Sequence, residues 1–365
     1  MNLFLPPDAP CSRELENLLT LIDRLYPLPQ RFRTALPRDV ADLSRLLTSE
    51  RPRRDMGYLG RPAMVSAYIR YFLPWNVYRL IRLLPQLPLN FAPGDAIVDI
   101  GSGPLTLPIA LWICRPDLRT LPLEFRCLDR TGPILDAGKK IIDALMTTVK
   151  ATELSHATAC VQHVGAPWKI RTIRGSLGDR IEGKKARLVT AINVFNELFW
   201  DEHEGPRKVA LRNAPMLAAL ADPEGSILVV EPGIPRSGEF IFHLRSELMS
   251  LGRLPLAPCT HTAACPLPAG RRGAKWCHFA FDTEKAPEAL HRLSRAAGLP
   301  KERATMSFLF AGPVTPDSHK IPAKELVIRI LSDPFPVAAR AAASKSLSRA
   351  AHHQQHISDQ SGRGG

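Results

Sequence analysis

The sequence lacks any apolar run near the roughly 18 residues that a membrane-spanning helix needs. Its start also lacks the basic segment and long apolar stretch of a secretory signal, and the first basic residue is Arg13. We therefore expect a cytoplasmic protein with no membrane partner. Cysteines are few, seven in 365 residues, and without an export signal we expect them to be reduced. A cluster of them then favours metal or redox chemistry over disulfides.

Acidic residues are in deficit. The chain has 48 lysines and arginines against 35 aspartates and glutamates, a formal net charge of +13. Such an excess attracts polyanions and favours a nucleic-acid partner, although a merely basic soluble protein would show the same balance. The 34 prolines predict many short elements and fixed loops. Apolar residues at 45% and charged residues at 23% are typical of a globular protein and exclude a wholly disordered chain.

Hydrophobic periodicity divides the chain into three parts. Residues 1–90 show helical spacing and predict an N-terminal helical region. Residues 91–336 alternate between helices and short apolar runs, which predicts an α/β domain with a doubly wound parallel sheet. Residues 337–365 are a low-complexity, mildly basic stretch that we predict to be a disordered tail. The predicted strands cover residues 96–100, 123–129, 168–173, 186–192, 226–231, 305–310 and 326–331.

A glycine turn follows the first predicted strand, in the order Asp99, Ile100, Gly101, Ser102, Gly103. Small residues let the backbone approach a ligand, and Pro104 is expected at the first position of the next helix. A dinucleotide site prefers a third glycine where this chain has Thr106, which counts against NAD and FAD. An aspartate before Gly-x-Gly instead resembles motif I of the class I S-adenosylmethionine methyltransferases. That resemblance implies that Asp99 helps to hold the methionine and ribose end of the cofactor.

Two further residues extend the predicted cofactor site. Asp129 ends the second strand, where a carboxylate accepts hydrogen bonds from ribose hydroxyls. Asn193 follows the fourth strand, and we expect this turn to face the sulfonium and the methyl acceptor. The predicted S-adenosylmethionine site therefore consists of Asp99, Gly101, Ser102, Gly103, Asp129 and Asn193. No catalytic residue is assigned, because no general base is identifiable. No Asn-Pro-Pro-Tyr motif follows the fourth strand, so amino-group methylation of adenine or glutamine by that route is not supported.

Three of the seven cysteines lie in a loop rich in proline, glycine and arginine at residues 255–279: Cys259, Cys265 and Cys277. Soft thiolates in such a loop suit zinc or an iron–sulfur cluster. His261 and His278 could complete a tetrahedral zinc site. The alternative is that these cysteines are small packing residues.

The arrangement as a whole resembles the Rsm-type ribosomal small-subunit methyltransferase-like proteins, found in bacteria and as a mitochondrial small-subunit assembly factor. The resemblance covers residues 60–336 and rests on the segments 71–76, 99–104, 196–198, 231–235, 257–267, 276–279 and 332–336. It implies a class I S-adenosylmethionine methyltransferase fold, association with small-subunit ribosomal RNA, and a 4Fe-4S cluster on four cysteines. Cys259, Cys265 and Cys277 match three of those ligands. No cysteine follows residues 332–336, where the family has the fourth.

Three hypotheses for function follow, each for a monomer. The first is S-adenosylmethionine-dependent methyl transfer to ribosomal RNA in the small subunit. The second is a non-catalytic RNA-binding assembly factor with a structural iron–sulfur or zinc site, and the third is a zinc-stabilised methyltransferase acting on a protein or small molecule. Under the second, basic residues around the cysteine loop could contact phosphates: Arg236, Arg245, Arg253, Arg271, Arg272 and Lys275.

Overall fold

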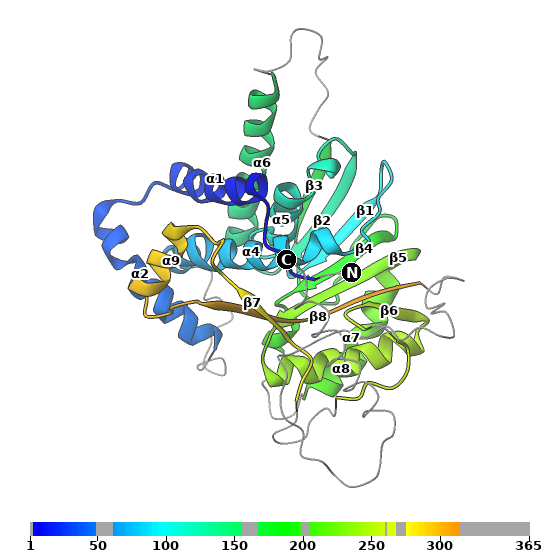
Figure 1. Cartoon of the computed structure of the whole chain (residues 1–365). Coiled ribbons are helices and arrows are strands. Elements are labelled where there is room, and N and C mark those ends of the chain that lie inside the picture. The colour runs from blue at the N-terminus through cyan, green and yellow to red at the C-terminus, as the bar shows by residue number, and fades with distance from the viewer. Residues whose placement is uncertain are drawn as a thin grey trace, which may run out of the picture. The chain divides into compact units, whose positions relative to one another are not determined.

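The computed structural model describes residues 3–48, 61–154, 167–198, 205–259, 261–267 and 275–313 (Figure 1). All of these fall within one unit that spans Met1–Leu331. The predicted tail at residues 337–365 and the predicted strand at 326–331 lie outside the described residues. In the part that is described, no helix combines the length and the apolar character that crossing a bilayer requires.

A single mixed sheet forms the centre of the unit (Figure 1). Its strands are β1 (Ala96–Ile100), β2 (Leu123–Asp129), β3 (Trp168–Arg174), β4 (Ala186–Ile192), β5 (Ala221–Pro232), β6 (Arg253–Ala257), β7 (Phe279–Asp282) and β8 (Arg303–Pro313). The order is β3-β2-β1-β4-β5-β8-β6, with β7 also paired to β8. Strands β1 to β5 are parallel, and β8 runs antiparallel to β5, β6 and β7.

The chain winds outward from the middle of this sheet in both directions. From β1 it goes to β2 and β3 on one side, and β4 then returns to the other flank of β1. This order confirms the predicted doubly wound α/β fold of the class I S-adenosylmethionine methyltransferases. The sheet is mixed, however, and not parallel throughout as predicted, because β8 runs antiparallel to its neighbours. The reversal between β1 and β4 is a topological switch point, and ligands of open α/β sheets bind at such points beyond the carboxyl ends of the strands.

Helices cover both faces of the sheet. They are α1 (Ala9–Leu25), α2 (Gln30–Leu47), α3 (Pro62–Ala67), α4 (Leu73–Leu83), α5 (Thr106–Cys114), α6 (Gly132–Leu154), α7 (Pro206–Leu220), α8 (Pro235–Ser250) and α9 (Glu288–Ala296). Successive strand residues point to opposite faces. Ile97 accordingly joins the core that contains α4, α5 and α6, whereas Val98 joins the core that contains α7 and α8.

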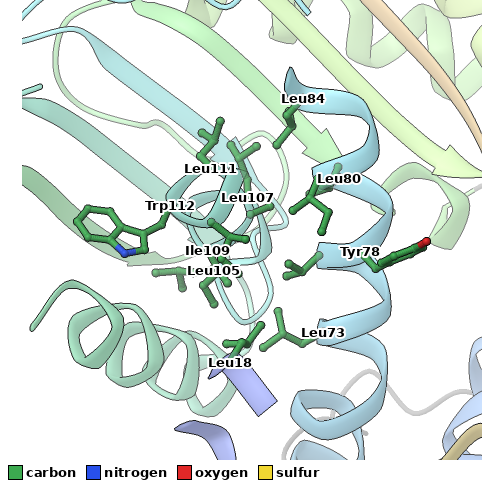
Figure 2. Packing of buried hydrophobic residues seen from close by; sticks show 14 of the residues in the cluster. Leu18, Leu73, Tyr78, Leu80, Leu84, Leu105, Leu107, Ile109, Leu111 and Trp112 are labelled. Carbon is green, nitrogen blue, oxygen red and sulfur yellow. The ribbon is translucent and has the colours of Figure 1, made fainter. Parts of the chain in front are cut away.

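The N-terminal helical region shares its core with the sheet. Figure 2 shows Leu73 and Leu80 of α4 facing Leu107 and Leu111 of α5, with Leu18 of α1 beside them. All five side chains are less than 2% exposed. Helix α5 is apolar on every side because α4, α6 and the sheet surround it. The predicted helices in residues 1–90 therefore form, and they hold the segment after β1 in place.

Candidate functional site

The glycine turn after β1 has left-handed backbone at three positions. The φ angles are +62° at Gly101, +53° at Gly103 and +57° at Leu105. A Cβ atom at Gly101 would lie 2.4 Å from Val194 Cγ2, so both the backbone angle and the available space require glycine there. Pro104 does not begin the next helix as predicted. Leu105 caps α5 in the left-handed region, and the helix starts at Thr106.

Asp99 is buried at the base of this turn, 2% exposed. Ser102 Oγ donates to Asp99 Oδ2 at 2.5 Å, and Thr190 Oγ1 of β4 donates to Asp99 Oδ1 at 2.6 Å. Burial raises the pKa of Asp99 from 3.8 to about 6, although the two hydroxyl donors oppose that shift. Asp99 therefore links the glycine turn to β4 through these two hydrogen bonds. Because it is buried, its carboxyl group is costly to ionise.

Asp99→Asn is expected to gain stability over the wild type as the pH rises. Between the unfolded pKa of 3.8 and the folded pKa of about 6, the folded wild type holds more protons, so its unfolding free energy falls with pH. An asparagine does not titrate, and its amide can still pair with both hydroxyls. The difference in unfolding free energy between Asp99→Asn and the wild type should change by on the order of 1–3 kcal/mol between about pH 4 and about pH 7.

Urea unfolding at the two pH values measures this difference. Asp143→Asn is the control, because Asp143 is 45% exposed and pairs only with Lys139 of its own helix in the described contacts. A stability difference between Asp99→Asn and wild type that stays constant with pH would contradict the assignment of a raised pKa to Asp99.

Asp129 ties the glycine turn to the second strand. Gly103 N donates to Asp129 Oδ2 at 2.9 Å, and Thr131 N donates to Asp129 Oδ1 at 2.8 Å. Ser102 N also donates to Leu128 O at 2.9 Å. Burial raises the pKa of Asp129, and the two backbone donors oppose the rise. Four of the six residues predicted for the cofactor site, Asp99, Ser102, Gly103 and Asp129, are thus joined by hydrogen bonds at one edge of the sheet.

Asn193 lies beyond the end of β4, one strand away from the glycine turn. Its φ is +58°, and its backbone N–H donates to Val230 O at 2.7 Å. Val194 follows it, and its side chain occupies the position where a side chain at Gly101 would lie. Asn193 also lines a cavity of about 400 Å³ at the carboxyl ends of β4 and β5. The predicted site residues therefore lie along one edge of the sheet, with Asn193 on the cavity side.

The cavity has an aromatic wall that sequence reasoning missed. Tyr68, Tyr71, Phe72 and Trp75, from the π-helical turn Tyr68–Phe72 and α4, line it. Its volume is within the range of small-molecule sites. A Cβ atom at Gly103 would lie 4.0 Å from the Tyr68 hydroxyl, so the cavity adjoins the glycine turn.

Glu231, at the end of β5, fixes the loop after β4. Its side chain is fully buried and accepts from Phe195 N at 2.8 Å and from Asn196 N at 3.1 Å, one on each carboxylate oxygen. Burial raises its pKa to about 7, against the effect of these donors. Arg130 pairs with Glu197 at 3.4 Å and so joins the loops that follow β2 and β4. The site edge is therefore held at β1, β2, β4 and β5.

The cysteine loop does not form the predicted metal centre in the described residues. No group of three or more histidine, cysteine, aspartate or glutamate side chains is placed there to hold a metal ion. Arg245 donates to the carbonyl oxygens of His261 and Ala263 at 2.9 and 2.8 Å, whereas Trp276 packs over Gly238. These two anchors are seven residues apart on α8, which is about 10 Å along the helix.

The two anchors attach the two parts of the cysteine loop to different turns of α8. Cys259 and Cys265 belong to the segment held by Arg245, and Cys277 belongs to the segment held by Trp276. His278 stacks on Trp276, with ring centroids 4.7 Å apart, rather than joining a ligand set. The iron–sulfur or zinc site on Cys259, Cys265 and Cys277 is therefore not supported by the described residues and stays a prediction.

Two of the arginines predicted to contact phosphates have structural roles instead. Arg253 donates to the carbonyl oxygens of Asp222, Pro223 and Gly225, and Arg245 holds the cysteine loop. Both side chains are buried, and their guanidinium groups donate to backbone carbonyl oxygens. Arg271 and Arg272 lie outside the described residues.

Comparison with known protein families identifies the family of this chain. Residues 64–344 match the family described as mitochondrial small ribosomal subunit Rsm22. The chain belongs to the Rsm22 family. The match begins in α3, so the aromatic wall, the glycine turn and the cysteine loop are all parts of the Rsm22-like region. Helices α1 and α2 precede it. The resemblance predicted from the sequence is confirmed.

Solved structures similar to this Rsm22-family chain are methyltransferases. A geranyl diphosphate C-methyltransferase from Streptomyces coelicolor is 11% identical, with a TM-score of 0.35, and the match covers 71% of this chain and 88% of that one. A methyltransferase from Geobacter sulfurreducens is 11% identical, with a TM-score of 0.33 and coverage of 66% and 91%. The 16S rRNA methyltransferase KamB is 16% identical, with a TM-score of 0.33 and coverage of 61% and 89%. Among curated proteins, none matches the sequence.

Proposed function

We propose that this Rsm22-family protein binds S-adenosylmethionine and acts on or with the ribosomal RNA of the small subunit, as a cytoplasmic monomer. The observation that carries the proposal is the hydrogen bond from Gly103 N to Asp129 Oδ2 at 2.9 Å. It brings a glycine turn and a carboxylate together at the switch point of the sheet. The family description supplies the link to the small ribosomal subunit.

The residues at this edge fit an adenosyl ligand. Gly101 and Gly103 present backbone without a side chain, and Asp129 keeps further lone pairs to accept from ribose hydroxyls. Asp99 and Ser102 act from beneath by holding the turn in shape. When bound, S-adenosylmethionine supplies an electrophilic methyl group. The chain's own contribution is to place the acceptor beside Asn193, so that alignment provides most of the rate.

One observation favours a non-catalytic alternative. Glu231 is the buried carboxylate of the cavity, and both of its oxygens already accept from backbone N–H groups. It is therefore poorly placed to remove a proton from an acceptor. An RNA-binding assembly factor that keeps the cofactor site would have this arrangement.

An assay of methyl transfer from methyl-labelled S-adenosylmethionine to purified small subunits distinguishes the enzyme from the non-catalytic assembly factor. Label in ribosomal RNA that disappears in Asp129→Ala supports the enzyme. RNA binding without label supports the assembly factor. A protein that binds neither the cofactor nor the RNA is inconsistent with both.

RNA binding is expected to weaken steeply with salt. The net charge of +13 favours phosphate contacts, and each contact releases a counterion on binding. We expect the affinity for small-subunit RNA to fall on the order of tenfold or more for a fourfold rise in salt concentration. Fluorescence anisotropy across a salt series measures the slope, with a DNA hairpin of the same length as the control. An affinity that does not change with salt would argue against phosphate recognition.

A further inference from the structure

The strand at one end of the sheet carries a concentration of positive charge. Strand β3 is the last in the strand order and pairs only with β2 in the part of the chain that is described. Residues 167–187, which contain β3 and the loop leading to β4, have seven basic residues and two acidic ones, a net charge of +5. Lys185 and Arg187 donate to the backbone carbonyl oxygens of Ala219 and Glu224, and the other five basic residues are exposed.

No helix covers the start of β3 on the face of the sheet where α7 and α8 pack. Residues 175–185, all of which are described, connect β3 to β4 without helical structure. Leu177 and Ile181 of this connection pack against the core of α7 and α8, as does Ile173 of β3. Lys169 and Arg171 are on the same face as Ile173, because alternate strand residues share a face. Both are exposed, so this part of the face is open to solvent.

The loop brings a third cation, Lys184, to the same part of the sheet. Arg126 Nη1 donates to Lys184 O at 2.6 Å, and Arg126 of β2 is the partner of Arg171 in the register with β3. A Cβ atom at Gly183 would lie 2.3 Å from Arg126 Cζ, so the loop lies directly on the Arg126 guanidinium. Lys184 is exposed. We refer to Lys169, Arg171 and Lys184 together as the β3 surface.

One carboxylate lies within the β3 surface and does not neutralise it. Glu124 Oε1 accepts from Arg126 Nε and from Arg171 Nη1, both at 3.3 Å. The hydrogen bond from Arg126 lowers the pKa of Glu124, and the charges of Arg126, Arg171 and Lys169 lower it further. Three cations therefore share one carboxylate. An exposed ion pair is weak because solvent screens it, so Arg171, whose side chain is 56% exposed, can exchange Glu124 for a phosphate at little cost.

The rest of the loop leaves this excess of positive charge in place. Asp179 accepts from Ser176 N at 2.7 Å and so holds a turn of the loop itself. Glu182 is exposed, and Arg180 precedes it by two residues. Neither β3 nor the loop exposes a large apolar side chain. A membrane-binding surface combines basic with apolar side chains, whereas cations alone fit the phosphate backbone of a nucleic acid.

The strand that carries the β3 surface leads to the cofactor edge. Arg174, at the end of β3, is the register partner of Asp129, and Gly175 N donates to Asp129 O at 3.0 Å. Lys169 lies five residues before Arg174, about 17 Å away at roughly 3.3 Å per residue. A nucleic acid held on the β3 surface is therefore too far from Asp129 to supply the acceptor at that point, but it can place a neighbouring nucleotide there. Phosphate contacts fix the register of a nucleic acid without reading its bases.

We propose that the β3 surface is a docking site for the phosphate backbone of small-subunit ribosomal RNA. This deepens the proposed function and rests on it, because the family description supplies the small ribosomal subunit as the source of the RNA. Charged side chains on an edge strand also hinder its pairing with another chain. Lys184 lies on the loop and not on the strand, so that role does not account for it.

Salt-dependent binding of a full-length small-subunit ribosomal RNA transcript tests the docking site. The double variant Lys169→Gln, Lys184→Gln should bind about tenfold or more weakly than the wild type. Its plot of log affinity against log salt concentration should be shallower by about two, one for each lost phosphate contact. The control, Lys285→Gln with Arg292→Gln, removes two exposed charges from the segment after β7, at the opposite end of the sheet from β3. It should keep the wild-type slope.

Lysine acetylation, read by mass spectrometry on the wild-type protein, locates the RNA without any substitution. We expect bound RNA to protect Lys169 and Lys184 from acetylation. Lys285 should react equally with and without RNA.

Other results would overturn the docking site. Equal slopes and affinities in the two double variants contradict it, as does equal acetylation of Lys169 and Lys184 with and without RNA. If the surface variant loses binding to phosphatidylserine vesicles but keeps RNA binding, the partner is an anionic membrane and the proposal is wrong. Calorimetry with S-adenosylmethionine on the same samples keeps the two proposals apart. A wild type that binds cofactor and RNA, with both variants binding RNA equally, refutes only the docking site, whereas a wild type that binds neither refutes the proposed function as well.

Discussion

Asp129→Ala is expected to weaken S-adenosylmethionine binding by about a hundredfold. The carboxylate accepts from Gly103 N and Thr131 N, so its removal frees the glycine turn from β2 and also removes the acceptor for the ribose hydroxyls. Hydrogen bonds to charged groups contribute about 1.5–3 kcal/mol each, and two losses at the lower end of this range, about 3 kcal/mol together, account for the expected factor. Isothermal calorimetry of both proteins measures it.

The matched control is Asp143→Ala. Asp143 pairs with Lys139 on the surface of α6, and its removal changes the net charge equally. Asp129→Asn adds a second comparison, because an amide keeps one acceptor oxygen for Gly103 N and should recover part of the affinity. Equal affinity in wild type and Asp129→Ala would show that Asp129 has no part in holding the ligand.

Gly138→Ala is expected to destabilise the protein by about 1–3 kcal/mol, although alanine is the better helix former. Gly138 lies within α6, where the change would ordinarily stabilise a helix by about 0.5–1 kcal/mol. Here a Cβ atom would lie 2.3 Å from the carbonyl carbon of Pro104 and 2.4 Å from its oxygen. Backbone cannot move aside as a flexible side chain can, so the turn or the helix must shift.

The expected cost also reaches the cofactor site, since Pro104 follows Gly103 directly in the glycine turn. Gly132→Ala, at the start of the same helix, meets only Arg174 Cδ at 3.8 Å and should be neutral or slightly stabilising. Urea unfolding of the three proteins gives the stabilities, and calorimetry gives cofactor affinity. A stabilised Gly138→Ala would mean that α6 and the turn do not pack this closely.

Much of the sheet could be predicted from local sequence. The predicted strands at residues 96–100, 123–129 and 186–192 match β1, β2 and β4, because each is a short apolar run with a glycine or polar boundary. Asp99, Ser102, Gly103 and Asp129 could be assigned to one site because parallel strands end at the same edge. The local pattern therefore specified both the elements and their common edge.

Other features depend on contacts between distant segments. Strands β6 and β7 flank the cysteine loop, and the prolines and short length of that segment conceal them in the sequence. Helix α5 starts at Thr106 rather than Pro104, because Leu105 adopts a left-handed backbone that no sequence rule favours for leucine. The cavity also brings Lys301 next to Trp75 of the aromatic wall, more than 200 positions away in the sequence, which periodicity alone does not reveal.

In the cysteine loop, local sequence predicts a site that the contacts between distant segments do not support. Closely spaced thiols in a proline-rich segment favour a metal site by composition. Their placement depends on Arg245, which holds the first part of the loop on α8, and on Trp276, which packs against Gly238 near the start of the helix and donates to Gly233 O before α8. From the sequence, Arg245 and Arg253 are expected to be exposed and to contact phosphates. Their structural role becomes evident only from the backbone carbonyl oxygens that accept from them.

The central claim is that the edge formed by the glycine turn and Asp129 holds an adenosyl ligand, and calorimetric titration of the wild-type protein with S-adenosylmethionine tests it most directly. The structure predicts binding of one molecule per chain, displaced by S-adenosylhomocysteine and unaffected by NAD, because Thr106 stands where a dinucleotide site has its third glycine. Absence of binding, or displacement by NAD as readily as by S-adenosylhomocysteine, would contradict it.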